Sequence, residues 1–139
     1  MNRRYYFAAP YSRHPEMREC RTQLVAAIPT VTVTSRWIDC HDGALEQSYT
    51  PEVLAAEPDR CWVHGAADLA DIIAADTLVS FTGAGGKGGR HIEHGYALAL
   101  EKRIVIIGLP ENIFHCHPWT ERYDTWAEFL ASEAEAAVR

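Results

Sequence analysis

The chain has 139 residues, 47% of them hydrophobic, and a formal net charge of −6 at pH 7. This length predicts a single domain, residues 1–139, that is large enough to bury a core. No apolar run approaches the ~20 residues that a membrane span requires, and the N-terminus does not resemble a signal peptide, so we expect a cytoplasmic protein. The acidic balance argues against a nucleic-acid polymer as partner, because phosphate backbones are bound by basic faces.

The cysteines do not follow the pattern of a disulfide or zinc framework. The chain contains four of them, without a CxxC pair: Cys20, Cys40, Cys61 and Cys116. They are expected to be reduced thiols. Cys40-His41 and His115-Cys116-His117 combine metal-ligand types, but their spacing is not that of a standard zinc site. We therefore expect neither a metal nor another cofactor.

Strand and helix patterns alternate from the N-terminus onward. Residues 4–9 form an apolar and aromatic run that is typical of a buried strand. Pro15 suits the first turn of a helix, which is expected to end at Pro29. The inner face of this helix is apolar and consists of Met17, Cys20, Leu24 and Ile28. Residues 31–37 alternate β-branched side chains and predict a second strand that ends at Trp37.

The alternation continues in the second half of the chain. Residues 39–59 form a polar, turn-rich connection, and connections of this length are more often functional than idle. After it we predict a helix over about 60–75 and strands over 77–81 and 103–107, with a helix between the two strands.

The C-terminal segment carries a helix-start signal. Thr125 and Glu128 match a capping box, which predicts a last helix to about Ala137. Strands that alternate with helices along the whole chain imply an α/β fold with a parallel sheet and right-handed crossovers.

Glu93 follows the strand pattern at 77–81 and a glycine-rich loop from Gly83 to Gly89, and an amphipathic helical run begins around it. The sequence therefore predicts a carboxylate in the first turn of a helix, at the carboxyl end of a strand. Open α/β sheets have their ligand crevices there. Because a helix N-terminus favours an anion, we expect Glu93 to be ionised at neutral pH. An ionised carboxylate in a crevice suits a nucleophile at an anomeric carbon, whereas the alternative is an ordinary glutamate on a solvated face.

The glycine loop satisfies GxGxxG from Gly83 to Gly88, but it lacks the context of a dinucleotide motif. Such a motif belongs to the first strand–helix turn and is followed by an acidic residue at the end of the next strand. A Walker A motif is excluded, because Gly88 precedes Gly89 rather than Lys-Ser/Thr. What remains is backbone that, together with Lys87 and Arg90, can hold a phosphate or carboxylate. The alternative is a surface loop without a ligand.

Three segments follow one another in a recognisable order: Tyr6-Phe7-Ala8-Ala9-Pro10, Asp68 to Asp76, and Gly89-x-x-x-Glu93-x-Gly95-x-Ala97. In this order they resemble the nucleoside 2-deoxyribosyltransferases and the related 2'-deoxynucleoside 5'-phosphate N-hydrolases. The resemblance covers Tyr6 to about His115. It implies a flavodoxin-like (Rossmann-like) three-layer sandwich, with a parallel sheet of about five strands flanked by helices. It also implies a homodimer or higher homo-oligomer with a shared active site.

The resemblance implies roles for individual residues. The catalytic glutamate of the family falls on Glu93, and its substrate-binding aspartate falls on Asp68. The aromatic residue of the first strand falls on Tyr6. The loop that lines the sugar or phosphate end of the substrate contains Ser12 and Arg13. The neighbouring subunit usually contributes a polar residue after the last strand, and this residue corresponds to Asn112 or His115.

Two positions depart from the family pattern. Lys87 replaces a small or acidic residue, which suits an anionic substrate. His91 replaces a common glycine, and its side chain narrows the pocket or adds a proton donor. Lys87, Gly89, Arg90 and His91 are therefore candidate substrate-binding residues. Trp37, at the end of the second predicted strand, is a candidate for stacking on a base, although a tryptophan there is also typical of a core.

The predicted function is cleavage or transfer at the N-glycosidic bond of a (deoxy)nucleoside or its 5'-monophosphate. Glu93 would attack C1' and form a covalent glycosyl-enzyme, while Asp68 would hold the base or a sugar hydroxyl. Water would complete a hydrolase cycle, and a second base would complete a transferase cycle. Two alternatives stay open. One is a non-catalytic nucleotide-binding sensor, favoured by Lys87 and His91, and the other is an NAD-type glycohydrolase, favoured by the literal GxGxxG.

Overall fold

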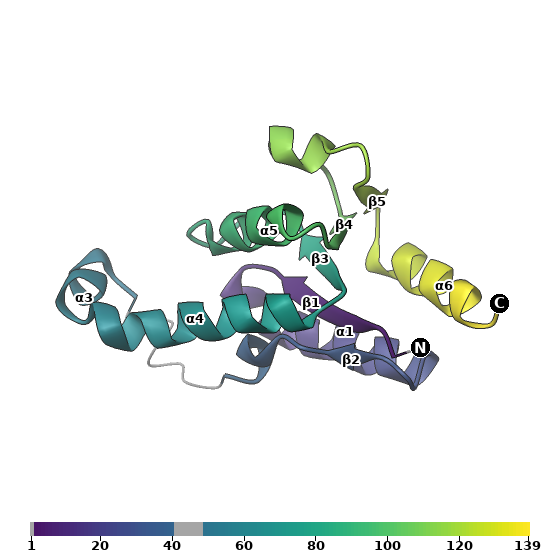
Figure 1. Cartoon of the computed structure of the whole chain (residues 1–139), viewed down its shortest axis with the longest axis horizontal. Helices are drawn as coiled ribbons and strands as arrows, with labels where there is room; N and C mark the ends of the chain where they lie inside the picture. The colour runs from purple at the N-terminus through teal and green to yellow at the C-terminus, as the bar shows by residue number, and fades with distance from the viewer. Residues whose placement is uncertain (1, 41–48) are drawn as a thin grey trace.

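The computed structural model describes residues 2–40 and 49–139, and within these residues five strands form one sheet (Figure 1). The strand order is β2-β1-β3-β4-β5, and every neighbouring pair is parallel. The bounds are β1 (Arg4–Ala8), β2 (Thr32–Val33), β3 (Thr77–Phe81), β4 (Arg103–Ile107) and β5 (Glu121–Tyr123). This is the order of flavodoxin-like folds. The predicted α/β fold with a parallel sheet is therefore confirmed.

The side chains of β1 divide the core into two parts, because successive residues of a strand point to opposite faces of the sheet. Tyr5 and Phe7 belong to one buried cluster, and Tyr6 and Ala8 belong to the other. Parallel strands covered on both faces are apolar throughout. This explains why the segment is a continuous apolar run.

Helices cover both faces of the sheet. One cluster combines the sheet with α1 (His14–Ala27) and with α6 (Trp126–Ala137), which contributes Phe129. The other cluster combines it with α4 (Pro58–Ala74) and α5 (Gly89–Ala99). A short helix, α3 (Pro51–Ala56), lies against the start of α4, away from the sheet (Figure 1). These layers form the predicted three-layer sandwich.

The predicted helix signals are present in the structure. Pro15 lies in the first turn of α1, and this helix ends at Ala27, just before Pro29. The Thr125 hydroxyl accepts a hydrogen bond from the Glu128 amide at 3.2 Å and so caps α6. Such caps provide partners for backbone N–H groups that have none within the helix.

The predicted second strand is too long. Only Thr32–Val33 is a strand, and Arg36–Asp39 forms a 3-10 helix, η2. Beyond Val33, side chains take the place of strand-to-strand hydrogen bonds to β1. The Phe7 amide donates to the Ser35 hydroxyl at 2.7 Å, and the Trp37 indole donates to the Phe7 carbonyl at 2.8 Å. Because β1 obtains its partners in this way, the chain can turn away after Val33.

One α-helix and one strand were not predicted from the local patterns. Helix α3 lies in the connection that was expected to be irregular, and β5 lies in a segment for which no strand was predicted. Part of that connection, residues 41–48 with His41 and Gly43, lies outside the described residues.

Candidate active site

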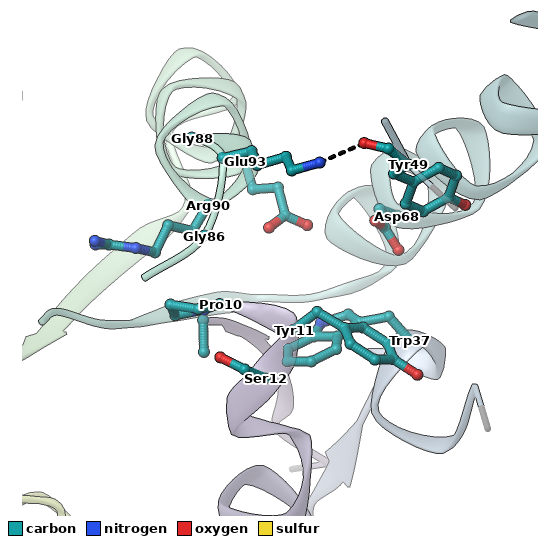
Figure 2. A pocket seen from close by; sticks show the side chains of 13 residues that line it. Pro10, Tyr11, Ser12, Trp37, Tyr49, Asp68, Gly86, Gly88, Arg90 and Glu93 are labelled. Atoms are coloured by element: carbon teal, nitrogen blue, oxygen red, sulfur yellow. Dashed lines mark hydrogen bonds between the residues drawn. The ribbon is translucent and has the colours of Figure 1, made fainter. Parts of the chain in front are cut away.

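A cleft of about 590 Å³ opens at the carboxyl ends of β1 and β3. Here the strand order reverses, because β1 lies between β2 and β3, and such switch points are the usual ligand sites of open α/β sheets. The walls of the cleft come from five places: the segment after β1, η2, Tyr49, α4, and the glycine loop with the start of α5 (Figure 2).

Two carboxyl groups enter the cleft from different helices, Asp68 from α4 and Glu93 from α5 (Figure 2). Both residues are partly buried. The hydroxyl of Tyr6, a fully buried residue of β1, donates a hydrogen bond to Oε2 of Glu93. The structure thus brings together the three residues to which the resemblance assigned the catalytic centre.

The cleft raises the pKa values of both carboxyl groups. Burial, and next the charge of Asp68, raise the pKa of Glu93 to about 8, although the Tyr6 hydrogen bond opposes this shift. Burial, and next the charge of Asp71, raise the pKa of Asp68 to about 7, against the opposing effect of Arg36. Two nearby carboxyl groups in such a site retain a proton in the neutral range.

The prediction that Glu93 is ionised at neutral pH is therefore wrong for this structure. Glu93 is the fifth residue of Gly89–Ala99 and lies in the second helical turn, not in the first. The helix dipole acts mainly within the first turn, whereas burial beside a second carboxyl group acts directly on Glu93. Burial first, and then the charges of Glu93 and Asp68, also raise the pKa of Tyr6 well above its ordinary value, so its hydroxyl stays a donor.

Aromatic side chains form the wall opposite α5. Trp37 contacts both core clusters and also lines the cleft. Its ring lies 6.2 Å from that of Tyr11, whose hydroxyl donates to the Cys40 carbonyl. Tyr49 also lines the cleft and was missed by the sequence analysis. It lies in the polar connection, where no motif or periodicity singles it out.

The glycine loop closes the opposite side of the cleft and approaches Pro10 closely. Gly86 has a φ of +81°, and a Cβ there would lie 3.4 Å from the Cβ of Pro10. Gly88 has a φ of +95° and immediately precedes α5. Positive φ favours glycine at both positions. Between them, the Lys87 ammonium donates to the Tyr49 carbonyl across the cleft (Figure 2).

The two arginines near this loop are engaged in other contacts. Arg13 donates to Glu16 at 2.7 and 2.8 Å and to the Thr82 carbonyl at 3.1 Å, and it does not line the cleft. Arg90 lines the cleft, but its guanidinium pairs with Glu111 and donates to the Gly83 carbonyl at 2.8 Å. In Figure 2 its side chain points away from Glu93. The arginines thus hold consecutive carbonyls at the beginning of the loop.

Three other candidates, His91, Asn112 and His115, form a separate cluster beside the cleft. The Asn112 amide lies 3.3 Å from Nδ1 of His91 and 3.4 Å from Nε2 of His115. The His115 ring lies 4.7 Å from that of the buried His94. None of these side chains lines the cleft of this chain.

No protein-family model matches the sequence, and no curated protein does. Among solved structures, the chain is similar to the CMP N-glycosidase BcmB of Clostridium botulinum. The identity is 19% and the TM-score 0.56, and the match covers 94% of this chain and 98% of that chain. The two chains share a fold.

Two absences concern only residues 2–40 and 49–139. No group of three His, Cys, Asp or Glu side chains in these segments is arranged to hold a metal ion. None of the helices described there is long and apolar enough to cross a membrane.

The arrangement in the cleft is suited to nucleophilic and acid–base chemistry. Glu93 is positioned by a hydrogen bond from Tyr6, and a second carboxyl group faces the same space. A pair of carboxyl groups with one proton between them can supply a nucleophile and an acid at neutral pH. The aromatic wall and the glycine loop provide surfaces for a planar ring and for an anion.

Proposed function

We propose that this protein cleaves the N-glycosidic bond of a nucleoside 5'-monophosphate, or of the nucleoside itself, through a covalent glycosyl-enzyme on Glu93. The observation that supports this most strongly is the pair Glu93 and Asp68 in one cleft, with the Tyr6 hydroxyl on Glu93. The fold is also that of a protein described as a CMP N-glycosidase. The order of motifs along the sequence agrees with this class of reaction.

In the first step, the Glu93 carboxylate attacks C1' of the sugar. The bond between C1' and the base breaks, and its electron pair goes to the base nitrogen, which takes the proton from Asp68. This step needs an ionised Glu93 and a protonated Asp68. In the empty cleft the pKa values of about 8 for Glu93 and about 7 for Asp68 place the shared proton mainly on Glu93, so it must first pass to Asp68. The Tyr6 hydrogen bond assists this transfer, because it stabilises the charged form of Glu93.

In the second step, Asp68, now ionised, removes a proton from water as the water attacks C1'. The bond between C1' and Glu93 breaks, which releases the free sugar or sugar phosphate and restores both carboxyl groups. A second base in place of water makes the same enzyme a transferase.

The other lining residues fit the remaining parts of a nucleotide. Trp37 provides an aromatic face for the base. Lys87, the Ser12 hydroxyl and the glycine loop before α5 are suited to a 5'-phosphate. Arg13 and Arg90 contribute by holding that loop in place.

The test is release of free base, followed by chromatography, from ribo- and deoxynucleosides and their 5'-monophosphates, with and without a second base as acceptor. Glu93→Ala should lower the rate by at least about a thousandfold, because the nucleophile is lost. Glu135→Gln, an exposed glutamate of α6, is the matched control and should retain activity.

The same assay examines the phosphate end. Lys87→Ala should raise the KM for monophosphates about tenfold or more, the effect of one charge-assisted hydrogen bond, and should change the KM for nucleosides little. Arg13→Ala is measured beside it. Equal effects of Lys87→Ala on both substrate classes would contradict a phosphate role.

If folded wild-type protein releases no base from any substrate but binds nucleotides, it is a sensor module, whereas nicotinamide release from NAD would identify an NAD-type glycohydrolase.

A further inference from the structure

Asp71 lies one helical turn after Asp68 on α4 and is buried, with 6% of its surface exposed. Its carboxylate accepts hydrogen bonds from the Arg36 backbone amide at 3.0 Å and from Nε of Arg36 at 2.8 Å. Its backbone carbonyl accepts a third, from the Thr34 hydroxyl at 2.8 Å. Through these hydrogen bonds, Asp71 connects α4 to the beginning of η2.

This attachment matters for the cleft because Trp37 directly follows Arg36. The indole of Trp37 is held on the opposite side by the Phe7 carbonyl of β1. The turn that carries the aromatic wall is thus fixed at two points, one of which is Asp71.

The same pair places two opposite charges beside Asp68. Asp71 lies near Asp68 on the same helix, and Arg36 lies near it on η2. The other titratable groups around Asp68 come from the remaining walls of the site and are Glu93, Tyr6, Tyr49 and Lys87. The Arg36 side chain is 69% exposed and that of Asp71 only 9%. Water therefore screens the positive charge more than the negative one, and the pair as a whole favours the protonated form of Asp68.

We propose that Asp71 is a positioning residue of the active site, which through Arg36 fixes the turn that carries Trp37 and which places a buried negative charge one helical turn from Asp68. The role in catalysis rests on the proposed function, in which Asp68 donates a proton to the departing base. The placement of the proton itself is measurable without turnover.

The experiment uses two variants that break the same ion pair from opposite sides, Asp71→Asn and Arg36→Gln. The Asp68 carboxyl is titrated by ¹³C NMR, and its signal is assigned by its loss in Asp68→Asn. In Asp71→Asn the pKa of Asp68 should fall, and in Arg36→Gln it should rise, each by about half a unit or more for the loss of one nearby charge. A merely structural pair would give the two variants the same direction of change.

The ion pair between Arg4 and Asp76 provides a matched control at the amino end of the same sheet. Asp76 also accepts from the backbone amide of its arginine, at 3.0 Å, and from the guanidinium at 2.9 Å. Asp76→Asn and Arg4→Gln should leave the titration of Asp68 unchanged. A shift in these controls equal to that in the Asp71 and Arg36 variants would overturn the proposal.

The pH profile of base release provides the second readout. Because the donor must be protonated, the alkaline limb should move to lower pH in Asp71→Asn and to higher pH in Arg36→Gln. Shifts in the same direction, or no shift of the Asp68 titration in either variant, would overturn the proposal. If Asp71→Asn does not fold, the exposed Arg36 still permits the test, and an unchanged Asp68 titration in Arg36→Gln alone refutes it. Opposite titration shifts in a protein that releases no base would support the role in placing the proton and refute only the proposed function.

Discussion

Replacement of Glu93 by glutamine should stabilise the fold while it abolishes the proposed activity. Glutamine has the same shape, and its carbonyl can still accept the hydrogen bond from Tyr6, but it carries no charge. In the native protein the pKa of Glu93 is raised to about 8, from an ordinary value of 4.5. The folded state therefore holds a proton that the unfolded chain has already released at neutral pH.

The sign and size of the effect follow from this difference. A raised pKa contributes stability that is fully present below pH 4.5 and is lost as the pH rises to about 8. In the unfolded chain the Glu93 carboxyl has its ordinary pKa of 4.5, and pH 7 lies about 2.5 pH units above this value. At 1.36 kcal/mol per pH unit, the difference corresponds to about 3 kcal/mol. Because Glu93 is only partly buried, solvent screening reduces this value, and we expect Glu93→Gln to gain about 1–3 kcal/mol at pH 7.

The assay is urea unfolding of wild type and Glu93→Gln at half-unit steps between pH 4 and 8.5. The difference in unfolding free energy should be near zero at pH 4 and should grow toward pH 8. Glu133→Gln is the control of opposite sign. Burial raises the pKa of Glu133, but hydrogen bonds from Arg103 and Tyr5 and the charges of Arg103 and Arg3 outweigh burial and lower it overall. This control should lose stability at neutral pH. A Glu93→Gln difference that is constant with pH, or that becomes destabilising toward pH 8, would refute the reasoning.

Two further predictions concern Tyr6 and His94. Tyr6→Phe removes the hydrogen bond to Glu93 and keeps the buried ring, so the rate of base release should fall roughly ten- to a hundredfold with little change in melting temperature; an unchanged rate would contradict the role of the hydroxyl. The pKa of His94 is lowered to about 4, first by burial and next by the charge of His115. The folded state therefore favours neutral His94, and the stability that this contributes is present above pH 6.5 and is lost as the pH falls toward 4. His94→Phe should therefore flatten the loss of melting temperature between pH 6.5 and 4, whereas an unaltered acid limb would show that His94 does not cause it.

Much of the fold could be predicted from local patterns. The strands at 77–81 and 103–107 were predicted with the observed bounds, because each is a short apolar run between turn or polar residues. The capping box also needs only neighbouring residues, and the structure confirms it. The second strand was predicted too long because its end depends on Phe7, which is remote in sequence and takes its partners from side chains of Ser35 and Trp37.

The sequence by itself determined which residues are available for the chemistry: a strand–helix order that produces a parallel sheet, a glycine loop, and carboxyl groups at Asp68 and Glu93. It also indicated the family resemblance that pairs these carboxyl groups. Only the tertiary structure decided their charge state and the surroundings that set it. Folding brings Asp68, Tyr6 and Glu93 together from two helices and a strand, joins Asp71 to Arg36, and adds Tyr49 to the wall. Electrostatic effects depend on distance and burial in space, which the order of residues along a chain does not contain.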